Sequence, residues 1–193
     1  MTVFDSFQQV APIPAETIER FAGRAPAEAV EAWRTNGAGF VGDDGYVRLV
    51  DPARAAEMLD GVIGLPDGAV VLFTTALGDL VVHANGVYLV VKARWGAIDV
   101  IQGASFAQVA ASLADPAQRD RVWEWQPYPD AAERDGVPAF EQCFGFVPLL
   151  ALGGPATADH LQLSGLYEHL AVIAQLAGPP QVRGLLSING TPS

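Results

Sequence analysis

Gly78–Gln102, with the sequence GDLVVHANGVYLVVKARWGAIDVIQ, contains two runs rich in β-branched and aromatic residues, Leu80–Ala84 and Val87–Lys92. Asn85-Gly86 separates the two runs. A type I′ turn needs positive φ at both central residues, and asparagine and glycine tolerate that conformation best. The segment therefore predicts a β-hairpin that turns at this dipeptide.

Further strands extend the hairpin in both directions. Ala97–Gln102 follows as a third run, and Ala69–Thr75 can pair on the other side through a short turn. Tyr46–Val50 has the alternation of a fifth strand. Such a sheet must bury a face against helices. The sequence therefore predicts an α+β fold, with a central antiparallel sheet, a meander of four to five strands, covered by N-terminal and C-terminal helices.

Helix start and stop signals flank the sheet. Prolines in the first turn and glycines after the last turn mark the early helices, whereas Ser105 or an Asp-Pro pair begins later ones. Pro127–Pro138 is predicted to be an exposed loop that can carry a turn of helix at Ala131–Arg134. Cys143–Gly154 is predicted to be an extended buried segment, and Asn189–Ser193 a frayed tail. The predicted helices are 16–22, 27–36, 53–64, Phe106–Leu113, Ala117–Trp125 and Ala158–Ala177.

Length and composition allow one compact core. The chain has 193 residues, of which 50% are hydrophobic and only 17% are charged, so disorder is not expected. Charged side chains become scarce toward the C-terminus. We therefore expect residues 1–125 to form an α+β domain and residues 126–193 to form a C-terminal extension packed on the same core.

The chain is strongly acidic, with a net charge of −11. Such a field repels nucleic acid and anionic membranes and attracts a basic partner, although acidity also serves solubility. The single cysteine, Cys143, cannot form an internal disulfide, and the sequence contains no recognisable signal peptide or membrane span. We expect a cytoplasmic protein that makes no direct contact with nucleic acid or membrane.

No catalytic constellation emerges from the reactive side chains. His83 lies on a predicted strand, while the spacing of His160 and His169 places them on opposite faces of a helix. Cys143 lies in an apolar run, which hides a thiol and raises its pKa. Nucleotide-binding, zinc-protease and hydrolase motifs are missing from the sequence. We therefore expect no catalytic residue, no metal site and no cofactor.

Several segments together resemble the GAD-like domain family with its C-terminal extension. The most specific piece is Cys143–Pro148, CFGFVP, followed by Ala151–Gly154, ALGG. Because the matching pieces are rich in glycine, proline and aromatic residues, they indicate shared architecture. The chain departs from the family pattern at Leu89–Val91, which replaces a polar turn. The other matching pieces are Pro14, Arg20-Phe21, Gly23–Pro26, Trp33, Gly37, Gly39-Phe40, Asp44-Gly45, Val50–Pro52, Leu77–Leu80, Gly86–Tyr88, Glu168–Leu170 and Gln175-Leu176.

That family is associated with immunity proteins for type VI secretion DNase toxins of the Tde–Tdi kind found in Agrobacterium. The resemblance implies a protein that is not an enzyme, but a cytoplasmic antidote that binds a cognate toxin and occludes its basic substrate site. An acidic surface can occupy a site that otherwise binds phosphates. Two acidic, loop-like segments and one tryptophan supply the candidate contacts: Asp43, Asp44, Trp125, Asp130, Glu133 and Asp135.

Two alternatives stay open from the sequence. One is a general peptide-binding or protein-binding adaptor similar to SMI/KNR-type domains, which a toxin gene immediately upstream would argue against. The other is a hydrolase that uses Cys143 and a histidine. Full burial of this thiol, with no histidine within hydrogen-bond reach, would exclude the second alternative.

Overall fold

The computed structural model describes residues 3–188, so the predicted fraying of Asn189–Ser193 lies outside the described part. Short 3-10 helices occur at Ala93–Trp95, Leu150–Leu152 and Ala158–His160, and a π-helix at Arg119–Trp123. The α-helices are α1 Ala15–Ala22, α2 Ala27–Asn36, α3 Pro52–Leu59, α4 Phe106–Ala114, α5 Pro116–Gln118, α6 Tyr128–Asp135 and α7 Leu166–Ala177. The strands are β1 Gln8–Ala11, β2 Ala38–Val41, β3 Val47–Leu49, β4 Val70–Thr75, β5 Leu80–Ala84, β6 Val87–Lys92, β7 Ala97–Ile101, β8 Gln142–Phe146, β9 Leu161–Gly165 and β10 Gln181–Leu185.

The predicted α+β fold with an antiparallel meander is confirmed. Within residues 3–188, eight strands form one sheet in the order β1-β2-β3-β4-β5-β6-β7-β10. Neighbours are antiparallel except β7 and β10, which are parallel. The hairpin turns at Asn85-Gly86 as predicted, with Ala84 opposite Val87. The sheet is larger than predicted because three of its strands, β1, β2 and β10, were not recognised. The residues of β1 are all exposed and those of β10 largely so, and neither strand has the alternation of a half-buried strand, whereas β2 lies in a short stretch between turn glycines.

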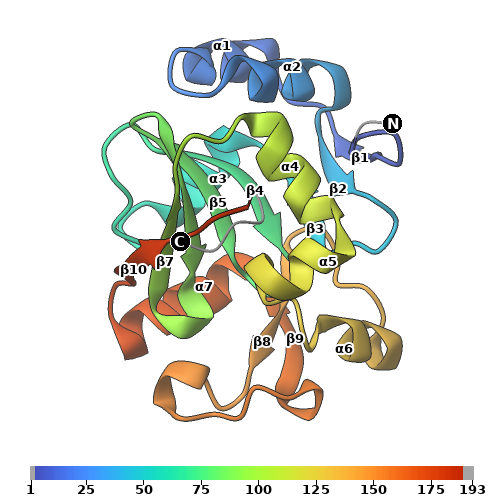
Figure 1. Ribbon diagram of the computed structural model, residues 1–193, viewed down its shortest axis with the longest axis vertical. Helices are drawn as coiled ribbons and strands as arrows, with labels where there is room; N and C mark the ends of the chain where they lie inside the picture. Colours follow the sequence, from blue (N-terminus) through green and yellow to red (C-terminus); the bar gives the residue numbers. More distant parts are fainter. Residues whose placement is uncertain (1–2, 189–193) are drawn as a thin grey trace.

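The sheet buries both of its faces. Val81 and Val90 face each other across β5 and β6 and belong to a core shared with α1, α2 and α4. Val82, one residue on, belongs to a second core shared with α3 and α7. Burial on both faces explains why the central strands are continuous apolar runs. In Figure 1, α1 and α2 lie at one end of the molecule and β8 and β9 at the other.

The C-terminal region differs most from the sequence-based predictions. The predicted helix Ala158–Ala177 is wrong, because Leu161–Gly165 forms strand β9 and pairs with β8 before α7 begins. In the predicted loop at Pro127–Pro138, the turn of helix expected at Ala131–Arg134 is part of a longer helix, α6. The predicted buried segment Cys143–Gly154 is buried only up to Phe146. Strand β9 could not be recognised because its pairing with β8, across the connection 147–160, leaves no pattern within the short strand itself.

Gly145, in the CFGFVP motif, allows β8 to pack directly against α7. A Cβ atom at this position would lie 2.4 Å from Cε1 of His169. We expect Gly145→Ala to lower the free energy of unfolding by about 1–3 kcal/mol, because a buried ring must move. Urea denaturation tests this against Gly64→Ala, where an added Cβ meets nothing within 4 Å. Equal stability of the two variants would contradict the packing role of Gly145.

Candidate functional site

The turn between β2 and β3 is fixed against the segment that leads into α6. The Asp44 carboxylate forms an ion pair with Arg119, and the Tyr128 hydroxyl donates a hydrogen bond to the Asp44 carbonyl. The backbone N–H of Tyr46 donates to Oδ1 of Asp44 at 3.0 Å. The structure therefore brings Asp44 next to elements that are 75 or more residues away in the sequence.

Trp125 is half-buried and rigidly held. Its Nε1 donates to Oδ1 of Asp120 at 2.6 Å, and the guanidinium carbon of Arg119 lies 5.0 Å from the centroid of its ring. The ring also meets Tyr46 edge to face, with 5.7 Å between centroids. An aromatic side chain already fixed in position loses little conformational freedom when a partner packs against it.

The other four predicted contact residues are exposed. Arg134 pairs with Asp135, and its hydrogen bonds hold the pKa of that carboxyl below the ordinary value. In the part of the chain that the structure describes, no hydrogen bond or ion pair engages the carboxylates of Asp43, Asp130 and Glu133. Trp125 and these three carboxylates, here called the acidic surface, are the groups most available to a partner.

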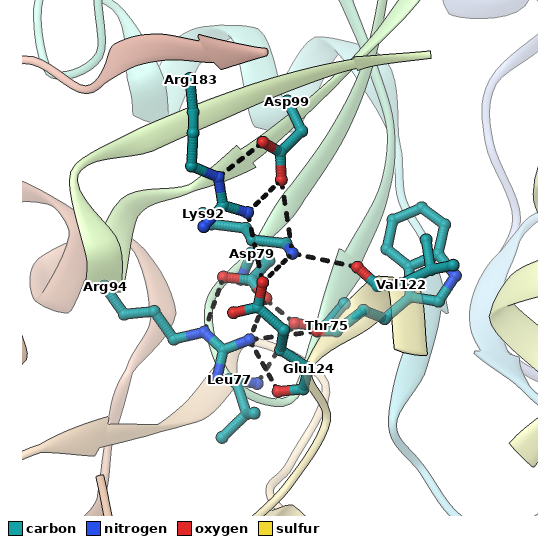
Figure 2. A network of polar contacts seen from close by, with 10 residues as sticks. Thr75, Leu77, Asp79, Lys92, Arg94, Asp99, Val122, Glu124 and Arg183 are labelled. Atoms are coloured by element: carbon teal, nitrogen blue, oxygen red, sulfur yellow. Dashed lines mark hydrogen bonds and ion pairs between the residues drawn. The ribbon is translucent and has the colours of Figure 1, made fainter. Parts of the chain in front are cut away.

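The sequence reasoning missed a network of charged side chains that connects the sheet to the segment just before Trp125 (Figure 2). Arg94 donates to both carboxylate oxygens of Asp79, at 3.2 and 2.9 Å, and both side chains are buried. Arg94 also donates to the carbonyls of Trp123 and Glu124 at 3.2 and 3.0 Å. These bonds fix the start of the Trp125 segment on the sheet.

The same network connects β10 to the sheet. Nζ of Lys92 lies 2.7 Å from Oε1 of Glu124 and 3.4 Å from Oδ2 of Asp99, while Arg183 bonds to both carboxylates. In the sequence, the network could have been suspected from the charged side chains that interrupt the apolar runs of the central strands. Their partners, Glu124 and Arg183, had no such signal.

The network predicts a specific loss of stability in acid. Burial would raise the pKa of Asp99 and Glu124, but hydrogen bonds from Arg183 and Lys92 and the Lys92 charge hold both below their ordinary values of 3.8 and 4.5. A carboxylate with a lowered pKa contributes stability above its unfolded-state value, and the contribution is lost as the pH falls through its folded-state value. We therefore expect the contribution of Asp99 and Glu124 to the free energy of unfolding to fall as the pH drops below these ordinary values, whereas Asp79, whose pKa is raised by burial, contributes with the opposite sign.

Arg183→Gln supplies the comparison, because it removes a cation that lowers both pKa values. Denaturant unfolding between about pH 7 and about pH 2 should show a smaller acid-dependent loss in this variant than in the wild type. Parallel profiles for the two proteins would mean that Arg183 does not set the titration of this network.

Cys143 lacks the surroundings of an activated thiol. It is fully buried, and burial raises its pKa to about 12. Within residues 3–188, no hydrogen bond joins its Sγ to a histidine: His83 bonds to the carbonyl of Arg24 and His160 to Thr157. Burial lowers the pKa of the third histidine, His169. A nucleophilic cysteine needs a lowered pKa or an adjacent base, so the hydrolase alternative gains no support.

We expect Cys143 to react about 10³-fold more slowly than a free thiol with an aromatic disulfide reagent near pH 8, since its thiolate fraction is correspondingly small. Absorbance of the released thiolate measures the rate, and the same protein in guanidinium chloride provides the reference. Fast reaction of the folded protein would contradict the burial of this thiol.

An apolar groove of about 410 Å³ lies between the β8–β9 hairpin and α7. Leu152 and Leu176 line it and are each more than half exposed. Exposed apolar clusters of this kind mark interaction sites in many proteins. The sequence reasoning missed the groove because it assigned these residues to an extended buried segment and one long helix.

The described residues contain no cluster of three or more histidine, cysteine or acidic side chains placed to hold a metal ion. None of the helices within residues 3–188 has the length and apolar character needed to cross a membrane.

Comparisons with known proteins place these surfaces in context. Residues 104–177 match the family described as type VI secretion system (T6SS) immunity protein Tdi1, C-terminal. None of the curated proteins compared with the chain matches it. The crystal structure of Atu4351 from Agrobacterium tumefaciens superposes with a TM-score of 0.72, covering 98% of this chain and 92% of that one at 15% identity. This likeness shows a shared fold, and the family match confirms the predicted resemblance to T6SS immunity proteins.

Proposed function

We propose that this chain, whose residues 104–177 match the T6SS immunity protein Tdi1 C-terminal family, is a cytoplasmic immunity protein. It binds a cognate secreted toxin, a DNase effector, and neutralises it by occluding the basic substrate site. The family match is the observation that carries this proposal. The matched segment includes Trp125 and α6, which form most of the acidic surface.

Charge supports the mode of inhibition. A DNase binds the phosphates of its substrate with basic side chains, and a net charge of −11 attracts such a surface from a distance. Asp43, Asp130 and Glu133 are exposed and have no internal cation to compensate them. They can therefore replace phosphates in the toxin's site at little cost to the fold, while Trp125 supplies a rigid apolar contact.

The proposal treats residues 1–125 as a GAD-like α+β domain and residues 126–193 as an extension on the same core. Two observations support packing on one core. Strand β10 pairs with β7, and Phe144 belongs to the core that includes Trp33. The arrangement predicts that neither part functions without the other.

Co-expression tests the proposed function. The toxin candidate encoded beside this gene is expressed in a host that it kills, with and without the full-length immunity chain. We expect survival, intact chromosomal DNA, and co-purification of the chain with a catalytically inactive form of the toxin. Cys143→Ala should protect equally well, since the proposal assigns the thiol no chemistry. Loss of protection in a folded Cys143→Ala protein, or no protection by the wild type, would contradict the proposal.

A further inference from the structure

A second groove, distinct from the acidic surface, lies between the N-terminal segment, α2 and α4. Its volume is about 740 Å³, within the range of about 300–1,000 Å³ that is usual for ligand pockets. Figure 1 shows α2 lying across one end of α4, close to the start of the chain. The groove is therefore formed by the N-terminal segment and α2 together with α4, which is about 70 residues further along the chain.

The apolar wall of this groove is continuous with the core. The ring of Phe4 stacks on Phe106 with 6.3 Å between centroids, and Phe106 stacks on Phe73 of β4 at 5.4 Å. Phe4, at the outer end of this stack, is only partly buried. A partner side chain that enters the groove would thus pack against a rigid surface.

The helical walls have different characters. Glu28, Glu31 and Thr35 follow one another at spacings of three and four along α2, and so lie on one face. On α4, Ala107 and Ala111 present small exposed side chains, which let a third helix approach closely. The groove thus has an acidic wall and a wall of small residues.

The charges in the groove determine which partner fits it. Among the described residues that line it, Asp5, Glu28 and Glu31 are acidic and none is basic. Glu31 accepts a hydrogen bond from Thr35 at 3.3 Å, but no cation pairs with Glu28 or Glu31 within residues 3–188. An apolar groove with an uncompensated acidic wall is complementary to an apolar segment that carries lysine or arginine.

We propose that the groove between α2 and α4 receives a cationic amphipathic helix of the toxin, with its apolar side chains against Phe4 and its basic side chains toward Glu28 and Glu31. This inference rests on the proposed function. At about 1.5 Å per residue, α2 and α4 are each about 14–15 Å long, which accommodates about three turns of a bound helix. The groove would anchor the toxin while the acidic surface covers the substrate site.

A synthetic peptide separates the groove from the toxin itself. The probe is a fluorescent amphipathic helix of leucine and lysine about 18 residues long, because shorter helices are marginal in water. Anisotropy should show binding to the full chain and none for the same peptide with glutamate in place of lysine. Chemical-shift changes should fall on α2, α4 and the N-terminal segment.

Two variants and one control make this test specific. We expect Glu28→Lys/Glu31→Lys and Ala107→Trp, which fills the groove, each to weaken peptide binding by at least about tenfold. Glu16→Lys/Glu19→Lys on α1 makes the same change in net charge away from the groove and should bind like the wild type. Circular dichroism and thermal unfolding confirm that each variant is folded. Equal weakening by the control, or full binding to Ala107→Trp, would overturn the proposal.

The toxin provides the second arm. If the wild type protects the host, both groove variants should co-purify with at least about tenfold less inactive toxin than the α1 control. Normal co-purification of the groove variants would overturn the groove as a toxin site and leave the immunity function intact. If the wild type does not protect the host, the proposed function is contradicted. The anisotropy measurement with the peptide then decides by itself whether the groove binds a cationic helix. If a second copy of this chain occupies the groove instead of the toxin, the wild type should elute as a dimer in size-exclusion chromatography. That outcome would also overturn the proposal.

Discussion

Replacing Arg94 with alanine should lower the free energy of unfolding by about 3–5 kcal/mol, because it leaves the carboxylate of Asp79 buried without a counter-charge. Both side chains are almost completely inaccessible, and two hydrogen bonds join them. The variant also leaves the carbonyls of Trp123 and Glu124 without a donor. We therefore expect a large fall in the urea midpoint, together with loosening of the Trp125 segment.

The Arg54–Glu141 pair is the matched control. Its geometry is similar, with Nε of Arg54 3.0 Å from Oε1 of Glu141, but both side chains are nearly half exposed. Arg54→Ala should cost at most about 1 kcal/mol, since solvent screens the pair and rehydrates the partner. Adding Asp79→Leu to Arg94→Ala should recover part of the lost stability by removing the buried charge. Similar losses for Arg94→Ala and Arg54→Ala would contradict a buried ion pair.

Reversing three charges of the acidic surface, in Asp43→Lys/Asp130→Lys/Glu133→Lys, should abolish protection against the toxin. The folded state should be unaffected, because these carboxylates make no internal hydrogen bond or ion pair within residues 3–188. Association with inactive toxin should slow by about 10²-fold at low salt, since attraction becomes repulsion at the contact. Surface plasmon resonance at several salt concentrations measures this rate.

The control reverses three exposed carboxylates elsewhere, in Glu16→Lys/Glu19→Lys/Glu57→Lys. Its net charge is the same as that of the first variant, so it isolates the position of the charge from the overall field. We expect it to protect the host and to associate at nearly the wild-type rate. If both variants lose protection equally, net charge alone attracts the toxin, and the acidic surface is not the contact.

The predicted site residues illustrate how far local sequence can identify a surface. Acidic loops are exposed in most folds, so the exposure of Asp43 and Asp130 could be anticipated. The internal role of Asp44 could not, because its partner Arg119 lies 75 residues away. The exposed apolar groove beside α7 was also missed, since apolar residues of a strand or helix are normally assigned to the core.

The local sequence was sufficient for the meander of β4 to β7 and for most of the helix starts, because their signals act between neighbouring residues. Asn85-Gly86 favours its turn in any context, and Ser105 caps α4 by bonding to the N–H of Gln108. Only the folded chain could decide that β9 pairs with β8, that β10 joins β7 and that Arg94 neutralises Asp79. Such contacts depend on which distant segments meet, and no periodicity within either segment carries that information.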